Sequence, residues 1–213
     1  MTAPRVVPLQ AAHRARVEEI LRATGAFREE EVAVALELVD DATGCTPSGD
    51  YECVGTFDAC GTLAGYACFG PTPDTDGTFD LYWIATDPTL HGSGFGRILL
   101  DGVERAIAQR AGRLLVAETS TRADYASTRA FYDRAGFTEA GTVADFYGPG
   151  DGRALFTRRI ASVGGVPDDD VRHARDARDR TDVNGTARLH PATDGRIPSI
   201  PTRAPDGRGA AVR

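Results

Sequence analysis

Hydrophobic and polar residues in the first half of the chain alternate between the spacing of a helix and that of a strand. In 11–24 and 29–40 the apolar residues fall on one helical face, which predicts two amphipathic helices. Four runs rich in β-branched and aromatic residues predict strands, and the two middle runs flank a glycine-containing turn, as in a hairpin. These strands are Val6–Leu9, Tyr51–Phe57, Leu63–Phe69 and Phe79–Thr86.

The second half of the chain predicts two more helices and three more strands. The helices are 94–111 and Ala123–Ala135, and the second ends at Gly136, a typical C-cap residue. The strands are Leu114–Glu118, Phe137–Phe146 and Ala154–Ile160. The order β, α, α, β, β, β, α, β, α, β, β predicts a mixed α/β sheet, in which a crossover helix joins the fourth strand to the fifth.

The composition changes near residue 160. Residues 161–213 contain no aromatic residue, and aspartate alternates with arginine through much of the segment. Such a segment buries too little apolar surface to offset the entropy that ordering costs. We therefore expect a folded domain over 1–160 and a disordered tail over 161–213. The tail is either an interaction arm or an extension without function, and the composition favours the second.

Charge and hydropathy exclude two classes of partner. The net charge is −7 at pH 7, which argues against a protein that mainly neutralises nucleic-acid phosphates. No run of eighteen apolar residues occurs, so we expect no membrane-spanning helix and no membrane partner. Met1–Leu9 lacks the apolar core of a secretory signal, which favours a cytoplasmic protein.

Four cysteines lie between positions 45 and 68. None forms a Cys-x-x-Cys pair and no histidine lies among them, so the spacing supports a metal site only weakly. We expect no metal and reduced thiols. Cys68 lies in the middle of a predicted strand, and we interpret it as a small, buried apolar residue.

A glycine-rich turn follows the fourth predicted strand and opens the third predicted helix. Glycines at alternate positions let the backbone approach a ligand closely, and the outward N–H groups of the helix start suit a phosphate or pyrophosphate. A tight turn that binds nothing is the alternative. A P-loop is excluded because the chain has no lysine, and the dinucleotide pattern Gly-x-Gly-x-x-Gly fails at its third glycine. The residues of the turn are His91, Gly92, Ser93, Gly94, Phe95, Gly96 and Arg97.

The turn and a second run, Tyr125–Phe137, form a recognisable pair of motifs. The second run is a predicted helix that ends in the pattern Tyr-x-x-x-Gly-Phe. Together they resemble the acyl-CoA loop, Gln/Arg-x-x-Gly-x-Gly/Ala, and the second signature of the GNAT superfamily of N-acyltransferases. His91 replaces the first residue of that loop, and Tyr125 replaces an asparagine that is frequent in that signature. The resemblance covers about residues 5–160 and implies a mostly antiparallel sheet of six to seven strands flanked by four helices.

The resemblance implies an N-acetyltransferase that uses acetyl-CoA. It would transfer the acetyl group to a primary amine of a small molecule or peptide, by direct attack in a ternary complex. The glycine-rich turn would bind the CoA phosphates, and backbone groups of Ile84, Ala85 and Thr86 would pair with the pantetheine amides. An acyl-CoA-binding module without catalysis, acting as a sensor or partner domain, is the alternative. Whether the chain forms a homodimer stays open.

Three side chains are candidates for the chemistry. By the resemblance, Tyr132 matches the tyrosine that approaches the CoA sulfur, which makes it the candidate general acid; packing over the helix end is the alternative. Asp80 and Glu118 are rival bases on neighbouring predicted strands, and a structural role stays open for each. Strand alternation predicts that one face carries Asp80 together with Tyr82, Ile84 and Thr86.

The acceptor amine is not identified by the sequence. Five acidic residues on and around the second predicted helix are interpreted as a solvated face, and attraction of a cationic acceptor is the less favoured alternative. They are Glu29, Glu30, Glu31, Asp40 and Asp41.

Overall fold

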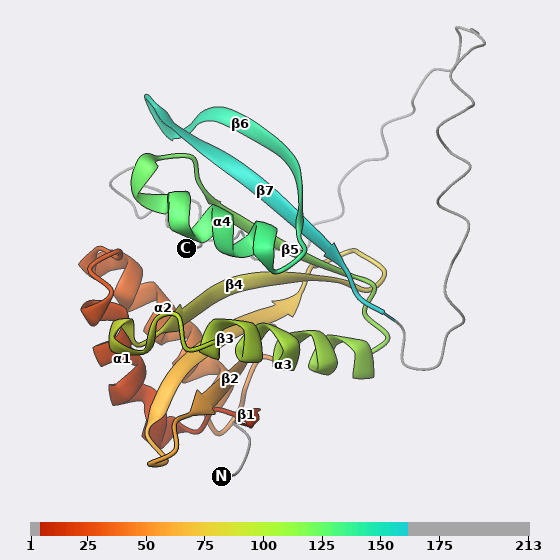
Figure 1. The fold of residues 1–213 in the computed structure, drawn as a ribbon. Coiled ribbons are helices and arrows are strands. Elements are labelled where there is room, and N and C mark those ends of the chain that lie inside the picture. Colours follow the sequence, from red (N-terminus) through yellow and green to blue (C-terminus); the bar gives the residue numbers. More distant parts are fainter. Residues whose placement is uncertain (1–4, 162–213) are drawn as a thin grey trace, which may run out of the picture.

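The computed structural model describes residues 5–161, so the expected tail lies, but for its first residue, outside the described residues. Within them, seven strands form one sheet in the order β1-β2-β3-β4-β5-β7-β6 (Figure 1). Neighbouring strands are antiparallel, except β4 and β5, which are parallel. The expected α/β fold, with a mostly antiparallel sheet and four flanking helices, is confirmed.

The elements follow the predicted order, with ends that shift by a few residues. The strands are β1 (Val6–Pro8), β2 (Glu52–Phe57), β3 (Leu63–Pro71), β4 (Thr78–Thr86), β5 (Leu114–Ser120), β6 (Thr138–Gly148) and β7 (Asp151–Arg159). The α-helices are α1 (Arg14–Ala23), α2 (Glu29–Thr43), α3 (Phe95–Gln109) and α4 (Ala126–Arg134). Short 3-10 helices at Ala11–His13 and Ala123–Tyr125 lead into α1 and α4, which explains why the helical patterns begin earlier than these helices.

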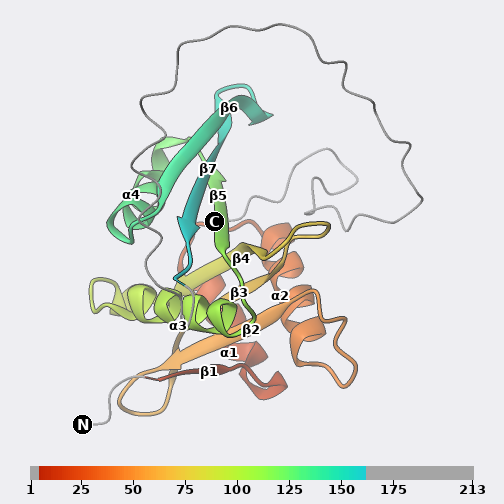
Figure 2. The ribbon, with the colours of Figure 1, turned by 90° about the vertical axis from the view of Figure 1, so that its right-hand side faces the viewer.

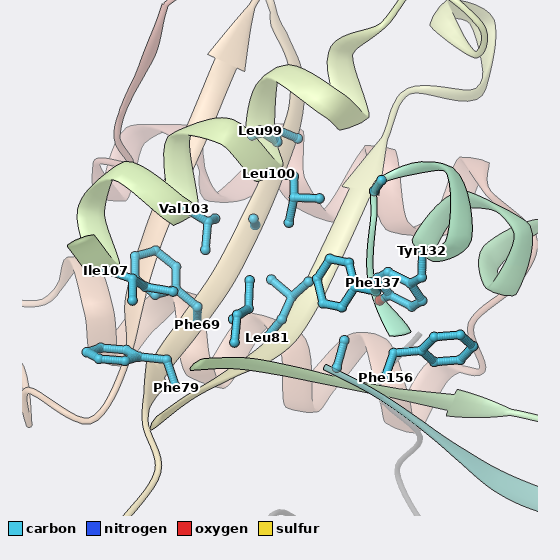
Figure 3. Close-up of a cluster of buried hydrophobic side chains, with 14 of the residues drawn as sticks. Phe69, Phe79, Leu81, Leu99, Leu100, Val103, Ile107, Tyr132, Phe137 and Phe156 are labelled. Carbon is cyan, nitrogen blue, oxygen red and sulfur yellow. The ribbon is translucent and has the colours of Figure 1, made fainter. Parts of the chain in front are cut away.

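Two hydrophobic cores lie on opposite faces of the sheet. Helices α3 and α4 cover one face, and Figure 3 shows the side chains packed beneath them. This core includes Phe69, Phe79, Leu81, Leu99, Leu100, Val103, Ile107, Tyr132, Phe137 and Phe156. Helices α1 and α2 cover the other face of β2, β3 and β4, where Tyr66, Trp83 and Cys68 are buried. Cys68 is therefore a buried core residue, as predicted.

A β-bulge interrupts β4. On β3, Cys68 lies opposite Trp83, and the next residue, Phe69, lies opposite Leu81. Tyr82 is therefore an extra residue on β4 with no counterpart on β3. Residues on the two sides of this bulge no longer follow one alternation.

The bulge changes which β4 side chains share a face. Asp80 lies between two residues of the α3/α4 core, so its side chain is on the opposite face, and Tyr82 belongs to the core beneath α1 and α2. Ile84 packs against the α3/α4 core, and Thr86 lies near α3. The prediction that all four residues share one face was wrong, because strict alternation does not continue through the extra residue.

Gly70 lets the chain before β2 lie against β3. A Cβ atom at this position would overlap the backbone carbonyl of Asp50 and approach the Tyr82 ring. We expect Gly70→Ala to lower the free energy of unfolding by about 1–3 kcal/mol, measured by denaturant unfolding, because backbone must move to make room. Gly141→Ala is the control, since the space around Gly141 is open. Equal losses in both variants would contradict this packing.

Candidate active site

Strands β4 and β5 pair over part of their length and then separate. Residues Thr78–Leu81 pair with Leu114–Ala117. Beyond this stretch β5 continues beside β7 and β4 beside β3, so in the described residues the backbone of 82–86 has no partner strand on its β5 side. Figure 2 shows β5, β6 and β7 turned away from β1–β4. The opening leaves backbone groups of β4 available to an extended ligand.

The predicted glycine-rich turn lies where the chain enters α3, after β4. Gly92 and Gly94 have φ angles of 80° and 86°, in the left-handed region that glycine adopts without strain. Gly94 is the N-cap, and its carbonyl accepts a 3.1 Å hydrogen bond from the N–H of Ile98. The preceding N–H groups, Phe95–Arg97, have no acceptor inside the helix, so this helix end suits an anion.

The other residues of the turn hold it in place. His91 and Ser93 donate their backbone N–H groups to the carbonyls three residues earlier, at 3.2 and 3.1 Å. The guanidinium of Arg97 donates a 3.2 Å hydrogen bond to the carbonyl of Ala135, at the end of α4. The ring of Phe131 lies 3.2 Å from the position of a Cβ atom on Gly96. The start of α3 is therefore packed against α4.

Asp87 joins the end of β4 to α1. Its carboxylate accepts hydrogen bonds from the Thr89 N–H at 2.8 Å and from the Thr89 hydroxyl at 2.6 Å, and it forms an ion pair with Arg16. The Thr89 hydrogen bonds, and then Arg16, hold the pKa of Asp87 below its usual range. A charged Asp87 therefore fixes the approach to the glycine-rich turn at neutral pH.

Tyr132, the predicted general acid, lies in the core beneath α4. Its side chain is 0% exposed, and its ring lies 5.2 to 5.6 Å, between centroids, from those of Phe131, Phe137 and Phe156 (Figure 3). Its hydroxyl has no hydrogen-bond partner in the described part of the chain. Burial, and then the charge of Glu118, raises the pKa of Tyr132, so the hydroxyl stays protonated and free to donate.

The two predicted bases lie on the sheet face opposite α3 and α4. Glu118 is the first residue of β5 beyond the stretch paired with β4, and it forms a buried ion pair with Arg153 of β7. Asp80 lies within the paired stretch and accepts a 2.8 Å hydrogen bond from the Thr72 hydroxyl. Burial raises the pKa of both carboxyl groups, and the positive charge of Arg153 partly offsets this rise. The charge of Asp80 further raises the pKa of Glu118. The two carboxyl groups therefore belong to one site.

Arg153 and Tyr147 complete this face, although no sequence motif predicted a role for either of them. The guanidinium of Arg153 lies 4.9 Å from the centroid of the Phe146 ring. The Tyr147 hydroxyl is buried without a hydrogen-bond partner in the described residues, and burial, then Glu118, raises the pKa of Tyr147. The available signal in the sequence was the position of these residues on the two sides of the final turn; only the sheet order shows that β7, with Arg153, lies beside β5.

Glu31 is buried, so the prediction that it lies on a solvated helix face was wrong. Its carboxylate accepts a 2.8 Å hydrogen bond from the backbone N–H of Arg28 and a 3.3 Å bond from its guanidinium, in a capping box at the start of α2. Glu29, Glu30 and Asp40 are exposed, as predicted. The charge of Glu31 acts on Tyr147, so the start of α2 borders the same site.

The four cysteines carry free thiols. Cys53 and Cys68 are buried opposite each other on β2 and β3, whereas Cys45 and Cys60 are exposed. Across residues 5–161, no group of three histidine, cysteine, aspartate or glutamate side chains is arranged to hold a metal ion. Over the same range, every helix is too short or too polar to cross a membrane.

Solved structures of acetyltransferases are similar to this one. A protein of the GNAT family from Desulfovibrio desulfuricans is 40% identical, with a TM-score of 0.71, and the match covers 75% of this chain and 100% of that chain. The ribosomal-protein-S18-alanine N-acetyltransferase of Escherichia coli is 21% identical, with a TM-score of 0.59 and coverage of 78% and 98%. An aminoglycoside 6'-N-acetyltransferase complexed with coenzyme A is 14% identical, with a TM-score of 0.59 and coverage of 76% and 99%. The last two similarities show the fold alone.

A family model also matches the chain. Residues 16–137 match the acetyltransferase (GNAT) family, a stretch that includes the glycine-rich turn and the second motif. Comparison with curated proteins finds no match. The family match and the relative at 40% identity confirm the resemblance carried by the two motifs. The chain belongs to the GNAT family of acetyltransferases.

Proposed function

We propose that this protein transfers an acetyl group from acetyl-CoA to a primary amine of a small molecule or peptide, by direct attack in a ternary complex. One observation carries the proposal: within residues 5–161 the buried Tyr132 hydroxyl has no hydrogen-bond partner, and the charge of Glu118, the first β5 residue past the stretch paired with β4, acts on it. The family match, and coenzyme A in the aminoglycoside acetyltransferase structure, support the choice of donor.

The donor contacts the protein at two places in this proposal. Its pyrophosphate binds the N–H groups at the start of α3, and its pantetheine arm pairs with the backbone of Ile84–Thr86. The unpaired edge of β4 supports this fit. Several buried hydroxyl groups lack a hydrogen-bond partner in the described residues. Those of Tyr132 and Thr119 support the proposal further, because a thioester in the opening would offer them acceptors.

The amine attacks from the face that carries the two carboxyl groups. We assign the base to Glu118, acting directly or through a water molecule, because it is the first β5 residue past the paired stretch. Asp80 lies within that stretch and is hydrogen-bonded to Thr72, which suits a supporting charge. Burial raises the pKa of Glu118, and a higher pKa makes the carboxylate a stronger base.

Tyr132 donates its proton to the departing thiolate. A backbone N–H of β4 at the opening stabilises the oxyanion that forms during the attack. Because a thiol is more acidic than a phenol, the donation is completed when Tyr132 regains a proton from solvent or from Glu118, which has taken the proton of the amine. The ring remains packed among its aromatic neighbours throughout.

A screen for acetyl transfer tests the proposed function. The acceptors are amino acids, polyamines, aminoglycosides and peptides with free N-termini, and free thiol is measured as it is released from acetyl-CoA. We expect release that needs both protein and amine, with an acetylated product of the matching mass. Acetyl-CoA binding without release from any acceptor would favour the non-catalytic acyl-CoA-binding module instead.

Acetyl-CoA is expected to raise the melting temperature, and Gly94→Glu or Gly96→Glu is expected to abolish that rise. A ligand at 100 times its Kd stabilises by about 2.7 kcal/mol, whereas the new carboxylate would repel the pyrophosphate. Gly61→Glu is the matched control for Gly94→Glu, because Gly61 and Gly94 both have a positive φ, of 82° and 86°, and open space around them. Scanning fluorimetry with and without acetyl-CoA measures the shifts. An unchanged shift in both turn variants would remove this turn from the donor site.

A further inference from the structure

The segment that leads into the glycine-rich turn is shaped by local hydrogen bonds. The chain leaves β4 at Asp87, passes through a 3-10 helix, Pro88–Leu90, and reaches the turn that opens α3 (Figure 1). Among the described residues, every hydrogen bond of residues 88–93 lies within the segment 87–93. Gly92 and Gly94 have open space around them. These local hydrogen bonds shape the segment, but they do not attach it to the sheet or to α1.

Arg16 of α1 attaches this segment through Asp87, and it uses all three nitrogens of its guanidinium group. One nitrogen forms an ion pair with the Asp87 carboxylate, and another donates a 3.3 Å hydrogen bond to the carbonyl of Leu63, at the start of β3. The third donates a 2.9 Å hydrogen bond to Glu19 on the same helix. The Asp87 side chain is only 13% exposed, so solvent and salt screen this ion pair less than a fully exposed one.

The Asp87 carboxylate connects Arg16 with the start of the turn. One of its oxygens pairs with Arg16, and the other accepts hydrogen bonds from the Thr89 N–H at 2.8 Å and from the Thr89 hydroxyl at 2.6 Å. Asp87 is thereby the N-cap of the 3-10 helix, whose first carbonyl, that of Pro88, accepts a 3.2 Å hydrogen bond from the N–H of His91. A short chain of contacts therefore runs from α1 to the first residue of the turn.

Different contacts hold the part of β4 that lies at the opening. Residues 84–86 pair with residues 65–67 of β3, and the N–H of Asp87 donates a 2.9 Å hydrogen bond to the carbonyl of Ala64. None of these backbone contacts includes the Arg16 side chain. Loss of Arg16 should therefore loosen the turn and leave the unpaired edge of β4 in place.

We propose, building on the donor site of the proposed acetyl transfer, that Arg16 is a positioning residue for the donor pyrophosphate. Through Asp87 it holds the glycine-rich turn so that the N–H groups at the start of α3 face the pyrophosphate, and it does not itself touch the donor. Without this attachment the glycines would let the turn sample other conformations. The apparent affinity falls in proportion to the fraction of molecules whose turn is competent to bind.

Two donors of different length test this proposal. S-acetylpantetheine has the thioester and the pantetheine arm of acetyl-CoA but no pyrophosphate. We expect Arg16→Gln to raise the Kd of acetyl-CoA about tenfold, as for a turn that is competent about a tenth of the time, and to change the Kd of S-acetylpantetheine by less than about twofold. Titration calorimetry of the full chain measures both constants. Equal weakening of both donors, or an unchanged Kd of acetyl-CoA, would overturn the proposal.

Arg110→Gln is the matched control. Arg110 forms an ion pair with Glu52 and lies over the ring of Phe79 at the far end of α3, so this variant also leaves a carboxylate without its arginine. It should leave both dissociation constants within about twofold of the parent. Arg16→Lys keeps a charge beside Asp87 but lacks the planar guanidinium, so we expect it to recover part of the lost affinity. An equal rise in the Kd of acetyl-CoA for Arg16→Gln and Arg110→Gln would contradict a positioning role.

The Asp87→Asn variant tests the same contact from the other side, and it decides the question if Arg16→Gln does not fold. Asparagine keeps an oxygen for Thr89 but removes the charge that pairs with Arg16. We expect the same difference between the two donors, and a double variant with Arg16→Gln that loses no more affinity than either single variant. Losses that multiply in the double variant would show that the two residues act independently, against the proposal.

Binding separates this inference from the proposed transfer, because it needs no acceptor. In turnover, Arg16→Gln should raise the KM for acetyl-CoA about tenfold and change kcat by less than about twofold. Acetyl-CoA binding that depends on Arg16, without thiol release from any acceptor, would contradict the proposed transfer alone. Thiol release with a donor affinity that does not depend on Arg16 would contradict this inference alone, and a parent protein that does not bind acetyl-CoA would overturn both.

Discussion

Glu118→Gln is expected to lower the single-turnover rate of acetyl transfer by about 100- to 10,000-fold, the range typical of general base catalysis. Glutamine keeps the size of the side chain but cannot accept the amine proton. The proposed donor contacts lie at the start of α3 and along β4, so we expect acetyl-CoA affinity to change little. Rapid mixing with saturating acetyl-CoA and an accepted amine measures the rate.

Glu104→Gln is the matched control for this experiment. Glu104 of α3 is half-buried and paired with Arg158 at 2.7 Å, and burial raises its pKa, so it shares the environment of Glu118 without lying at the opening. Both substitutions leave an arginine without its carboxylate, and both are expected to lower the melting temperature. Equal rates for Glu118→Gln and Glu104→Gln would show that Glu118 is structural.

The pH dependence of the same rate gives a second readout for Glu118. A protonated carboxyl group cannot accept a proton, so the parent rate falls as the pH drops through the pKa of Glu118. Burial raises that pKa, so this fall begins above the range of an ordinary glutamate, whose pKa is about 4.3. In the Glu118→Gln variant we expect this fall in rate to be absent. Only the pH dependence that comes from protonation of the acceptor amine should remain.

The order and type of the elements could be predicted because local patterns specify them. Each helix except α4 has a strong apolar face, and α4 is bounded by Gly136, whose φ of 84° glycine adopts without strain. The glycine-rich turn was predicted for the same reason, since its positive φ angles require glycine. The parts that the sequence left open depend on contacts between distant segments.

Three features of the candidate site could not be predicted from the sequence, each for a physical reason. The bulge at Tyr82 depends on how β3 pairs with β4, and no local pattern marks the extra residue. Glu31 is buried because it forms the capping box at the start of α2. The N-cap residue of this box is Arg28 instead of the usual serine or threonine, so the sequence does not show the usual pattern. Arg153 is paired with Glu118 because β7 lies beside β5, a neighbour relation that the order of elements along the chain does not reveal.

Tyr132→Phe is expected to lower the single-turnover rate by about 100- to 10,000-fold while acetyl-CoA affinity stays nearly unchanged. The substitution removes one hydroxyl that makes no hydrogen bond in the described residues, and it keeps the ring among Phe131, Phe137 and Phe156. The melting temperature should therefore stay the same or rise, because no partner is lost and a buried polar group is removed. A loss of rate without a loss of stability would be specific to proton donation.

Tyr66→Phe is a closely matched control for this variant. Tyr66 is also 0% exposed, its hydroxyl also lacks a hydrogen-bond partner in the described chain, and burial also raises its pKa. It lies in the core beneath α1 and α2, on the face opposite Tyr132, so its substitution should leave the rate within about twofold of the parent. Suppose instead that Tyr132→Phe also remains within twofold in a single turnover. Tyr132 is then a packing residue, and the thiolate takes its proton from solvent.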